Sequence, residues 1–201
     1  GLIDYLLPYS FTGGKLYFLP FCILEEDISE EVAVALEKSK RKAVVFNSWQ
    51  RGKELRKGNG IFDAAAKLVE KDKPDDIEYV VTKKNLPYDQ YVNLLDSVDI
   101  VFDQCFSQDR GMTAIYAMAK GKVVFTGWGD YVLKYYEGDN LNAAISAKPS
   151  ATCMYDKLLD LIEDREKMSR IKINAIAFIR NNHSEDKVYS KINSIIKMSN
   201  V

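Results

Sequence analysis

The chain has few of the residues that build metal centres and disulfide bonds. It has one histidine, His183, and three cysteines, Cys22, Cys105 and Cys153, which lie far apart and follow no metal-ligand spacing. This set is too small for a zinc cluster and leaves little room for a Ser/His catalytic triad. His183, in the stretch RNNHSED, is more simply a capping residue at a helix junction. An odd number of cysteines without a secretory segment predicts reduced thiols in a cytoplasmic protein.

The chain also lacks a charge excess, a long apolar run and the common nucleotide-binding motifs. Lys and Arg number 28 against 29 Asp and Glu, and this net charge of −1 gives no electrostatic reason to expect a nucleic-acid partner. No apolar run approaches the roughly 18 residues that span a membrane. Neither G-x-x-x-x-G-K-[ST] nor G-x-G-x-x-G occurs, which argues against standard mononucleotide hydrolases and NAD enzymes.

The composition fits one globular domain with a connecting segment. The chain has 201 residues, of which 47% are hydrophobic and 28% are charged, enough for one well-buried core. It begins with Gly1 instead of methionine, so we expect a processed or excised piece of a longer protein. We interpret residues 1–40 as an interdomain connection that ends in a short helix starting at Ser29, with one candidate strand at 16–19. Residues 41–201 form the domain.

Short apolar runs alternate with helical patterns along the first part of this domain. Runs rich in Val, Ile and Phe are short enough for strands, although buried helices are the alternative. This alternation predicts an α/β fold, with a Rossmann-like parallel sheet that has helices on both faces. The C-terminal segment is helical. The strands are expected at 42–47, 77–82, 99–103, 122–126 and 143–146, and the helices at 59–71, 88–98, 111–120, 150–164, 165–182 and 185–198.

Ligands of such a sheet bind beyond the carboxyl ends of its strands, where the first loop of this sequence is basic. Residues 48–60 hold four cations against the single acid Glu54, together with three glycines. Cations on a loop that leads into a helix N-terminus suit a diphosphate, because ammonium, guanidinium and backbone N–H donors converge there. A solvated basic loop explains the same residues equally well.

Two further loops lie at the same edge. Gly111 ends the loop at 104–111 and allows close backbone approach at a helix N-terminus, a second place for an anion. Asp109 and Arg110 can pair with each other or with a ligand, and a structural N-cap explains Asp109 equally well. In the third loop, Trp128 between two glycines can stack on a base or a sugar ring, and packing against a neighbouring helix is the alternative.

The order and spacing of these loops resemble the C-terminal domain of GT-B-fold glycosyltransferases of group 1, the GT4-like type. Lys57-Gly58 is followed by the helix NGIFDAAAKL and the strand IEYVV, and the tyrosine-led helix YDQYVNLLDSVDI enters DIVFDQ at 99–104. The stretch GMTAIYAMAKGKVVF is similar to the family segment G-x-x-x-x-E-A-M-A-x-G-K-P-V, and RNNHSEDKVYSKI is similar to the family's terminal helices. The resemblance covers roughly residues 40–195.

The resemblance implies a two-domain transferase of which this chain is the donor half. In this family the N-terminal domain binds the acceptor and the C-terminal domain binds the nucleotide-sugar. We therefore expect a retaining, metal-independent hexosyltransferase that moves a sugar from a nucleotide diphosphate to a glycan or lipid-linked acceptor, as in polysaccharide biosynthesis. It needs no cofactor, since the nucleotide-sugar is a substrate. The missing acceptor domain would make any peripheral contact with a membrane, and without it the fragment is expected to be inactive.

The resemblance implies a role for each residue of this sequence that stands at a site position of the family's motifs. Arg51 and Lys57 are expected to hold the donor diphosphate. Gly111 and Met112 are expected to offer backbone N–H groups to the phosphates, and Gln108 takes the catalytic position beside the sugar. Further contacts with the nucleoside and sugar are expected from Asp109, Tyr116 and Trp128.

The chain departs from the family at two of these positions. The family pattern E-x7-E places glutamates where this sequence has Gln108 and Tyr116. The second glutamate accepts hydrogen bonds from the ribose, and a phenol cannot reproduce a bidentate carboxylate. A degenerate, non-catalytic domain that binds a nucleotide or a partner is therefore the alternative. A flavodoxin-like binding module is a third hypothesis, which requires a crevice without clustered cations.

Overall fold

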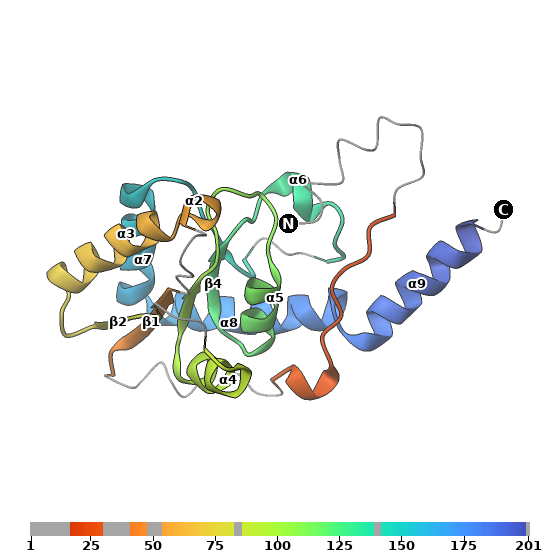
Figure 1. Ribbon diagram of the computed structural model, residues 1–201, viewed down its shortest axis with the longest axis horizontal. Helices are drawn as coiled ribbons and strands as arrows, with labels where there is room; N and C mark the ends of the chain where they lie inside the picture. The colour runs from red at the N-terminus through yellow and green to blue at the C-terminus, as the bar shows by residue number, and fades with distance from the viewer. Residues whose placement is uncertain (1–16, 30–40, 48–53, 83–85, 139–141, 200–201) are drawn as a thin grey trace.

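The computed structural model describes residues 17–29, 41–47, 54–82, 86–138 and 142–199. Within these ranges, parallel strands form one sheet in the order β2-β1-β3-β4-β5 (Figure 1). The predicted parallel α/β fold is confirmed, and the strand positions agree within about two residues of the sequence pattern. The strands are β1 (Ala43–Asn47), β2 (Ile77–Val81), β3 (Ile100–Phe102), β4 (Val123–Thr126) and β5 (Ile145–Ser146).

Helices cover both faces of this sheet because adjacent strand residues point to opposite sides. Val45 points into a core with α3 (Asn59–Asp72) and α7 (Ala151–Glu163). Phe46 points into the other core, with α4 (Tyr88–Ser97), α5 (Met112–Ala119) and the C-terminal part of α8 (Arg165–Asn182). Both strand residues are fully buried. The two short helices α2 (Glu54–Lys57) and α6 (Asp130–Leu133) lie at the edge where the strands end (Figure 1).

The sheet changes winding direction between β1 and β3. The chain runs from β1 outward to β2 and then returns to place β3 on the other side of β1, with Val45 opposite Ile100 and Asn47 opposite Phe102. The loops that leave β1 and β3 therefore lead to helices on opposite faces. Such a switch point leaves a crevice beyond the carboxyl ends of the two strands, where ligands of open α/β sheets bind.

The described part of the N-terminal connection packs on this domain. Ile23 and Ile28 are buried in the core, and the 3-10 helix η2 (Glu25–Asp27) lies between them. Ile23 N–H donates to the carbonyl of His183 at 2.8 Å. Residues 17–19 have no regular secondary structure, so the strand expected at 16–19 is wrong over its described part, and the helix expected after Ser29 lies outside the described residues.

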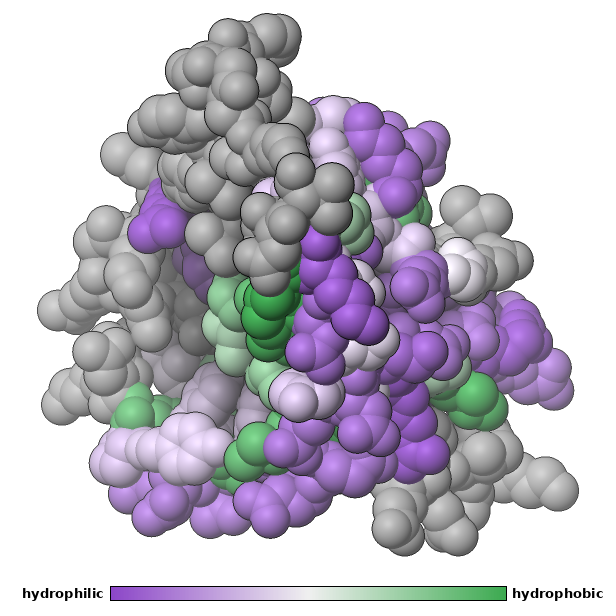
Figure 2. All heavy atoms as spheres, turned by 90° about the vertical axis from the view of Figure 1, so that its right-hand side faces the viewer, coloured by the Kyte–Doolittle hydropathy of each residue, from purple (hydrophilic) through white to green (hydrophobic). Residues whose placement is uncertain are grey.

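The C-terminal helices end with α9 (Glu185–Ser199), which extends away from the body of the molecule (Figure 1). The side chain of Ser150 caps α7 by accepting from Cys153 N–H, and Asp164 caps α8 by accepting from Lys167 N–H. The end that carries α9 is mainly hydrophilic, with small apolar patches (Figure 2). Among the described helices, none has the length and apolar character needed to cross a bilayer.

Candidate functional site

The loops that follow β1 and β3 meet at the switch point through a glycine. Gly58, between α2 and α3, has φ +76, in the left-handed region that favours glycine. A Cβ at this position would lie 2.2 Å from Cys105 Sγ, in the loop after β3. The Cys105 N–H also donates to the carbonyl of Lys57 at 3.0 Å. Lys57 is thereby held close to the end of β3.

Asp103 collects hydrogen bonds from three segments at this point. Its Oδ1 lies 2.8 Å from Lys57 Nζ, and its Oδ2 accepts from Thr126 Oγ1 at 2.9 Å. Oδ2 also accepts from the backbone N–H of Gly111 at 3.3 Å. The carboxylate is completely buried, whereas 24% of the Lys57 side chain remains exposed. Sequence analysis missed Asp103, although an acid directly after a buried strand at the carboxyl edge was a usable signal.

The N-terminus of α5 opens beside this carboxylate. Gly111 is the N-cap and has no side chain to satisfy the first N–H groups of the helix, which have no acceptor within the helix itself. Met112 follows and is 46% exposed. The structure thus brings Lys57 and the Gly111 backbone to one carboxylate, with Met112 next along the chain, and their role in holding a diphosphate stays a prediction. Arg51 lies outside the described residues.

A buried amide pair fixes the end of β1 to the start of α3. Asn59 Nδ2 donates to Asn47 Oδ1 at 2.7 Å, and Asn47 Nδ2 donates to the carbonyl of Asn59 at 3.1 Å and to the Tyr79 hydroxyl at 2.9 Å. Burial raises the pKa of Tyr79, so its hydroxyl stays protonated and donates to Asp63. This network, which sequence analysis also missed, holds the backbone that carries Lys57.

The loop with Gln108 and Asp109 packs on two glycines after β4. A Cβ at Gly127 would lie 2.3 Å from the Asp109 carbonyl oxygen, and a Cβ at Gly129 would lie 2.9 Å from Gln108 Oε1. Gln108 is exposed at this edge, whereas Asp109 is buried and accepts from Arg110 N–H at 2.8 Å. The structural N-cap considered for Asp109 is wrong, because Gly111 occupies that position.

Trp128 lies in the interior, only 6% exposed. Its ring meets Phe178 of α8 edge-on at 5.0 Å, and the Arg110 guanidinium lies over its face at 4.2 Å. Tyr136 covers the same guanidinium at 4.2 Å. The alternative of packing against a helix is therefore the observed one, and no open face is left on which a base could stack. Arg110 is 1% exposed, and burial lowers its pKa.

Tyr116 makes its polar contacts with the N-terminal connection and α4. Its hydroxyl donates to Asp27 Oδ1 at 2.9 Å and lies 3.2 Å from the Tyr88 hydroxyl. Burial, followed by these two partners, raises the pKa of Tyr116. These contacts place the hydroxyl in a different group from Lys57 and Gly111.

Metal and thiol chemistry have little support in this part of the chain. Within the described ranges, no group of three or more His, Cys, Asp or Glu side chains is placed to hold a metal ion. Cys22, Cys105 and Cys153 are free thiols, and burial raises the pKa of Cys105 to about 11, which keeps its thiol protonated.

Comparison with known proteins gives a clear answer for the fold. No family model matches the sequence, and neither does a curated protein. Among solved structures, the C-terminal domain of a group 1 glycosyltransferase, LpcC of Francisella tularensis, is similar, with TM-score 0.54 and 19% identity over 76% of this chain and 93% of that domain. The chain has the C-terminal domain fold of a GT-B glycosyltransferase.

Longer solved proteins also have a similar fold, as two examples show. S. aureus TarM, solved with UDP, Fondaparinux and α-GlcNAc-glycerol, has TM-score 0.63 and 14% identity over 94% of this chain and 41% of TarM. A putative UDP-N-acetylglucosamine 2-epimerase from Listeria monocytogenes has TM-score 0.52 and 14% identity over 85% of this chain and 49% of its own. The chain therefore spans less than half the length of both proteins.

Proposed function

We propose that this chain is the donor-binding domain of a glycosyltransferase that moves a sugar from a nucleotide diphosphate to a glycan or lipid-linked acceptor. The transfer retains the anomeric configuration and uses no metal, and a second domain binds the acceptor. Lys57 and the first N–H groups of α5 hold the diphosphate, with Arg51 as a further cation. Gln108 contacts the transferred sugar from the loop after β3.

The observation that carries this proposal is the convergence of Lys57 and Gly111 on one carboxylate. Both donate to Asp103, so a cation and a helix start lie next to each other at the switch point of the sheet. Donors of this kind stabilise the charge that develops on a departing diphosphate, and they are most effective when they are fixed before the reaction. Similarity to TarM, which was solved with UDP, supports a nucleotide diphosphate as the ligand.

Calorimetric titration of the chain with UDP and GDP tests donor binding. We expect Lys57→Ala to weaken the affinity by about 1–3 kcal/mol, the range for a charge-assisted hydrogen bond. Lys71→Ala is the matched control, because Lys71 is an exposed lysine on α3, and it should leave the affinity unchanged. A thermal melt of each variant separates loss of binding from loss of folding. Absence of nucleotide binding to the chain, together with an inert full-length protein, would refute the proposal.

A degenerate domain that no longer transfers sugar is the second candidate, and Tyr116 favours it. The Tyr116 hydroxyl binds Asp27 and Tyr88, so it is engaged in contacts within the chain. Tyr116→Glu distinguishes the two candidates. If a carboxylate at this position improves nucleotide binding, the site is a transferase site that has lost its ribose contact. No change, with no turnover by the full-length protein, would favour the degenerate domain.

A further inference from the structure

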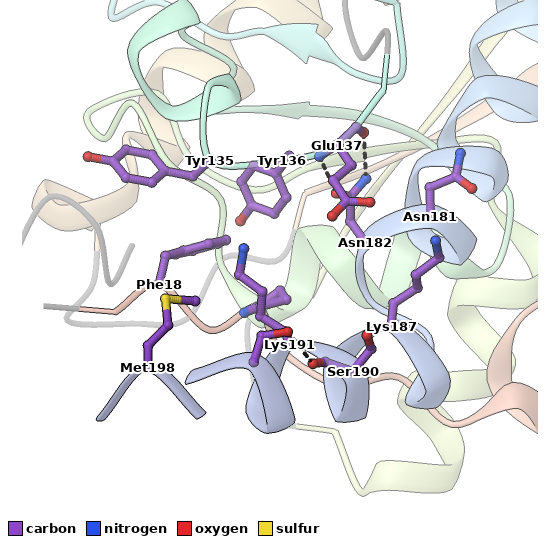
Figure 3. Close-up of a pocket in the computed structure, with 12 residues that line it drawn as sticks. Phe18, Tyr135, Tyr136, Glu137, Asn181, Asn182, Lys187, Ser190, Lys191 and Met198 are labelled. Carbon is purple, nitrogen blue, oxygen red and sulfur yellow. Dashed lines mark hydrogen bonds between the residues drawn. The ribbon is translucent and has the colours of Figure 1, made fainter. Parts of the chain in front are cut away.

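A pocket lies apart from the switch point, between α9 and the N-terminal connection. It encloses about 340 Å³, within the range of small-molecule sites. Phe18 and Tyr135 border it on one side, and Lys187 and Lys191 of α9 border it on the other (Figure 3). Neither Lys57 nor Gly111 lines this pocket.

The aromatic side of the pocket offers apolar surface for the face of a ring. Phe18 packs against Tyr135 at 5.6 Å and against the edge of Tyr136 at 4.9 Å, so the three rings support one another. The Arg110 guanidinium lies over Tyr136 at 4.2 Å and helps to hold that ring in place. Fixed aromatic rings of this kind provide a large contact area at little cost in side-chain entropy. The C–H faces of a sugar ring are apolar and match such a surface.

The opposite side offers hydrogen-bond donors. Asn181 and Ser190 line the pocket with exposed polar side chains, whereas the Asn182 amide is already engaged with the Glu137 backbone at 2.7 and 3.1 Å. Asn182 therefore fixes the shape of the pocket, and Asn181 and Ser190 remain at its surface. Sugar hydroxyls at the edge of a ring need partners of this type, since a buried hydroxyl without a hydrogen bond is costly.

The charge of the pocket favours an anion. Lys187 and Lys191 lie one helical turn apart and extend from α9 toward Asn181 and Tyr136 (Figure 3). Among the described residues that line the pocket, Glu137 is the one with a carboxylate, so two positive charges face one negative charge there.

We propose that this pocket binds a negatively charged sugar unit, a hexose ring that carries a carboxylate or a phosphate. The ring lies against Phe18 and Tyr135, its hydroxyls bind Asn181 and Ser190, and its charged group lies between Lys187 and Lys191. This site is separate from the donor site and does not depend on transferase activity. Tyr136 lines this pocket and also packs on Arg110, the residue before Gly111, so it connects the pocket to the loop that leads into α5.

NMR titration of the whole chain tests the site with four probes: glucuronate, glucose 6-phosphate, glucose and inorganic phosphate. We expect the two charged sugars to shift the amides around Asn181 and Lys191 saturably, with affinities about fivefold or more above those of glucose and of phosphate. Equal binding of glucose would overturn the role of the charge. Equal binding of inorganic phosphate would overturn the role of the ring, and absence of saturable shifts would overturn the site.

Single substitutions on α9 and in the N-terminal connection test which side chains contact the bound sugar. Lys191→Ala should weaken binding of the charged sugars by about two- to fivefold, as expected for an exposed charge pair, with no effect on glucose. Phe18→Ala should weaken both charged sugars and glucose, because it removes ring contact. Lys197→Ala is the matched control, since Lys197 lies on the same helix and does not line the pocket. If Lys191→Ala leaves the binding of charged sugars intact, the proposed contacts are wrong. Titration of the same variants with UDP shows separately whether the donor site still binds a nucleotide.

Discussion

The ammonium of Lys57 lies 2.8 Å from the carboxylate of Asp103. This pair joins the loop after β1 to the end of β3 across the switch point of the sheet. It also offsets part of the positive charge that the loop presents to solvent. A bound diphosphate would therefore meet a cation that is already paired, in addition to the N–H groups at the start of α5. We therefore expect this internal carboxylate to limit the affinity of the proposed site.

Removal of the Asp103 charge should strengthen nucleotide binding. Asp103→Asn keeps the shape of the side chain but removes one negative charge beside the diphosphate, so we expect UDP affinity to rise by about 1 kcal/mol, or about fivefold. The free energy of unfolding should fall by about 1–3 kcal/mol, because Lys57 and the Thr126 hydroxyl lose a charged acceptor. Calorimetry and urea unfolding measure the two effects. Asp75→Asn removes the same charge at an exposed position and serves as control. An unchanged or lower affinity would mean that Asp103 orients Lys57 for the ligand.

Alanine at each of two glycines of this edge should have a different effect, on nucleotide binding in one case and on stability in the other. A Cβ at Gly111 would lie 3.7 Å from both oxygens of Asp103, an ordinary contact, and its φ of −92 suits any residue. We expect Gly111→Ala to keep the free energy of unfolding within about 0.5 kcal/mol while its methyl group weakens UDP binding about tenfold. Gly127→Ala should instead cost about 1–3 kcal/mol of stability, since its Cβ would lie 2.3 Å from the Asp109 carbonyl oxygen. Equal urea midpoints for the two variants would contradict this comparison.

Because Arg110 is buried among aromatic rings, its replacement by lysine should destabilise the folded chain. The planar guanidinium lies over Trp128 and Tyr136 at 4.2 Å and over Phe178 at 5.0 Å. An ammonium cannot stack in this way, so Arg110→Lys should lower the free energy of unfolding by about 2 kcal/mol. Arg180→Lys, at an exposed position on α8, should stay within about 0.5 kcal/mol of the parent chain. Similar urea midpoints for both variants would show that stacking adds nothing.

Hydrophobic spacing was enough to predict the five strands and the longer helices of this fold, because each of them buries a local pattern, whereas the short helices α2 and α6 were not expected. The helix expected at 59–71 is Asn59–Asp72, and the strand expected at 77–82 is Ile77–Val81. The order of the strands was not available from spacing, since the position of β1 between β2 and β3 depends on contacts between distant residues. That order defines the switch point and therefore the site.

The side chains of the site were harder to predict than its backbone. Lys57 and Gly111 follow from loop chemistry, whereas the carboxylate that joins them becomes visible only when three loops are brought together. From the sequence alone, glycines on both sides of Trp128 indicate an exposed loop. The structure gives another reason for them, because Gly127 admits the backbone of the loop that carries Asp109. Trp128 is consequently free to point inward.

His183 links the α8–α9 junction to the N-terminal connection in a form that is neutral. Its Nδ1–H donates to the Phe21 carbonyl at 2.7 Å, while its Nε2 is buried without a hydrogen-bond partner among the described residues. Protonation would place a charged N–H there. Burial therefore lowers the pKa of His183 from 6.5 to about 4, although the hydrogen bond to Phe21 opposes this shift.

This depressed pKa predicts a loss of stability as the pH falls below 6.5. The unfolded chain binds a proton at this histidine near its ordinary pKa, and the folded chain does so only near 4, so the contribution is fully present above 6.5 and is lost between the two values. Complete loss of this contribution lowers the free energy of unfolding by about 3 kcal/mol, and about 1.4 kcal/mol of it is lost per pH unit. His183→Asn retains an N–H donor without titration, so its free energy of unfolding should be flat between about pH 7 and about pH 5.5, where the parent chain loses stability. Because the chain has no other histidine, parallel slopes for the two proteins would show that His183 is protonated as readily in the folded chain as in the unfolded one.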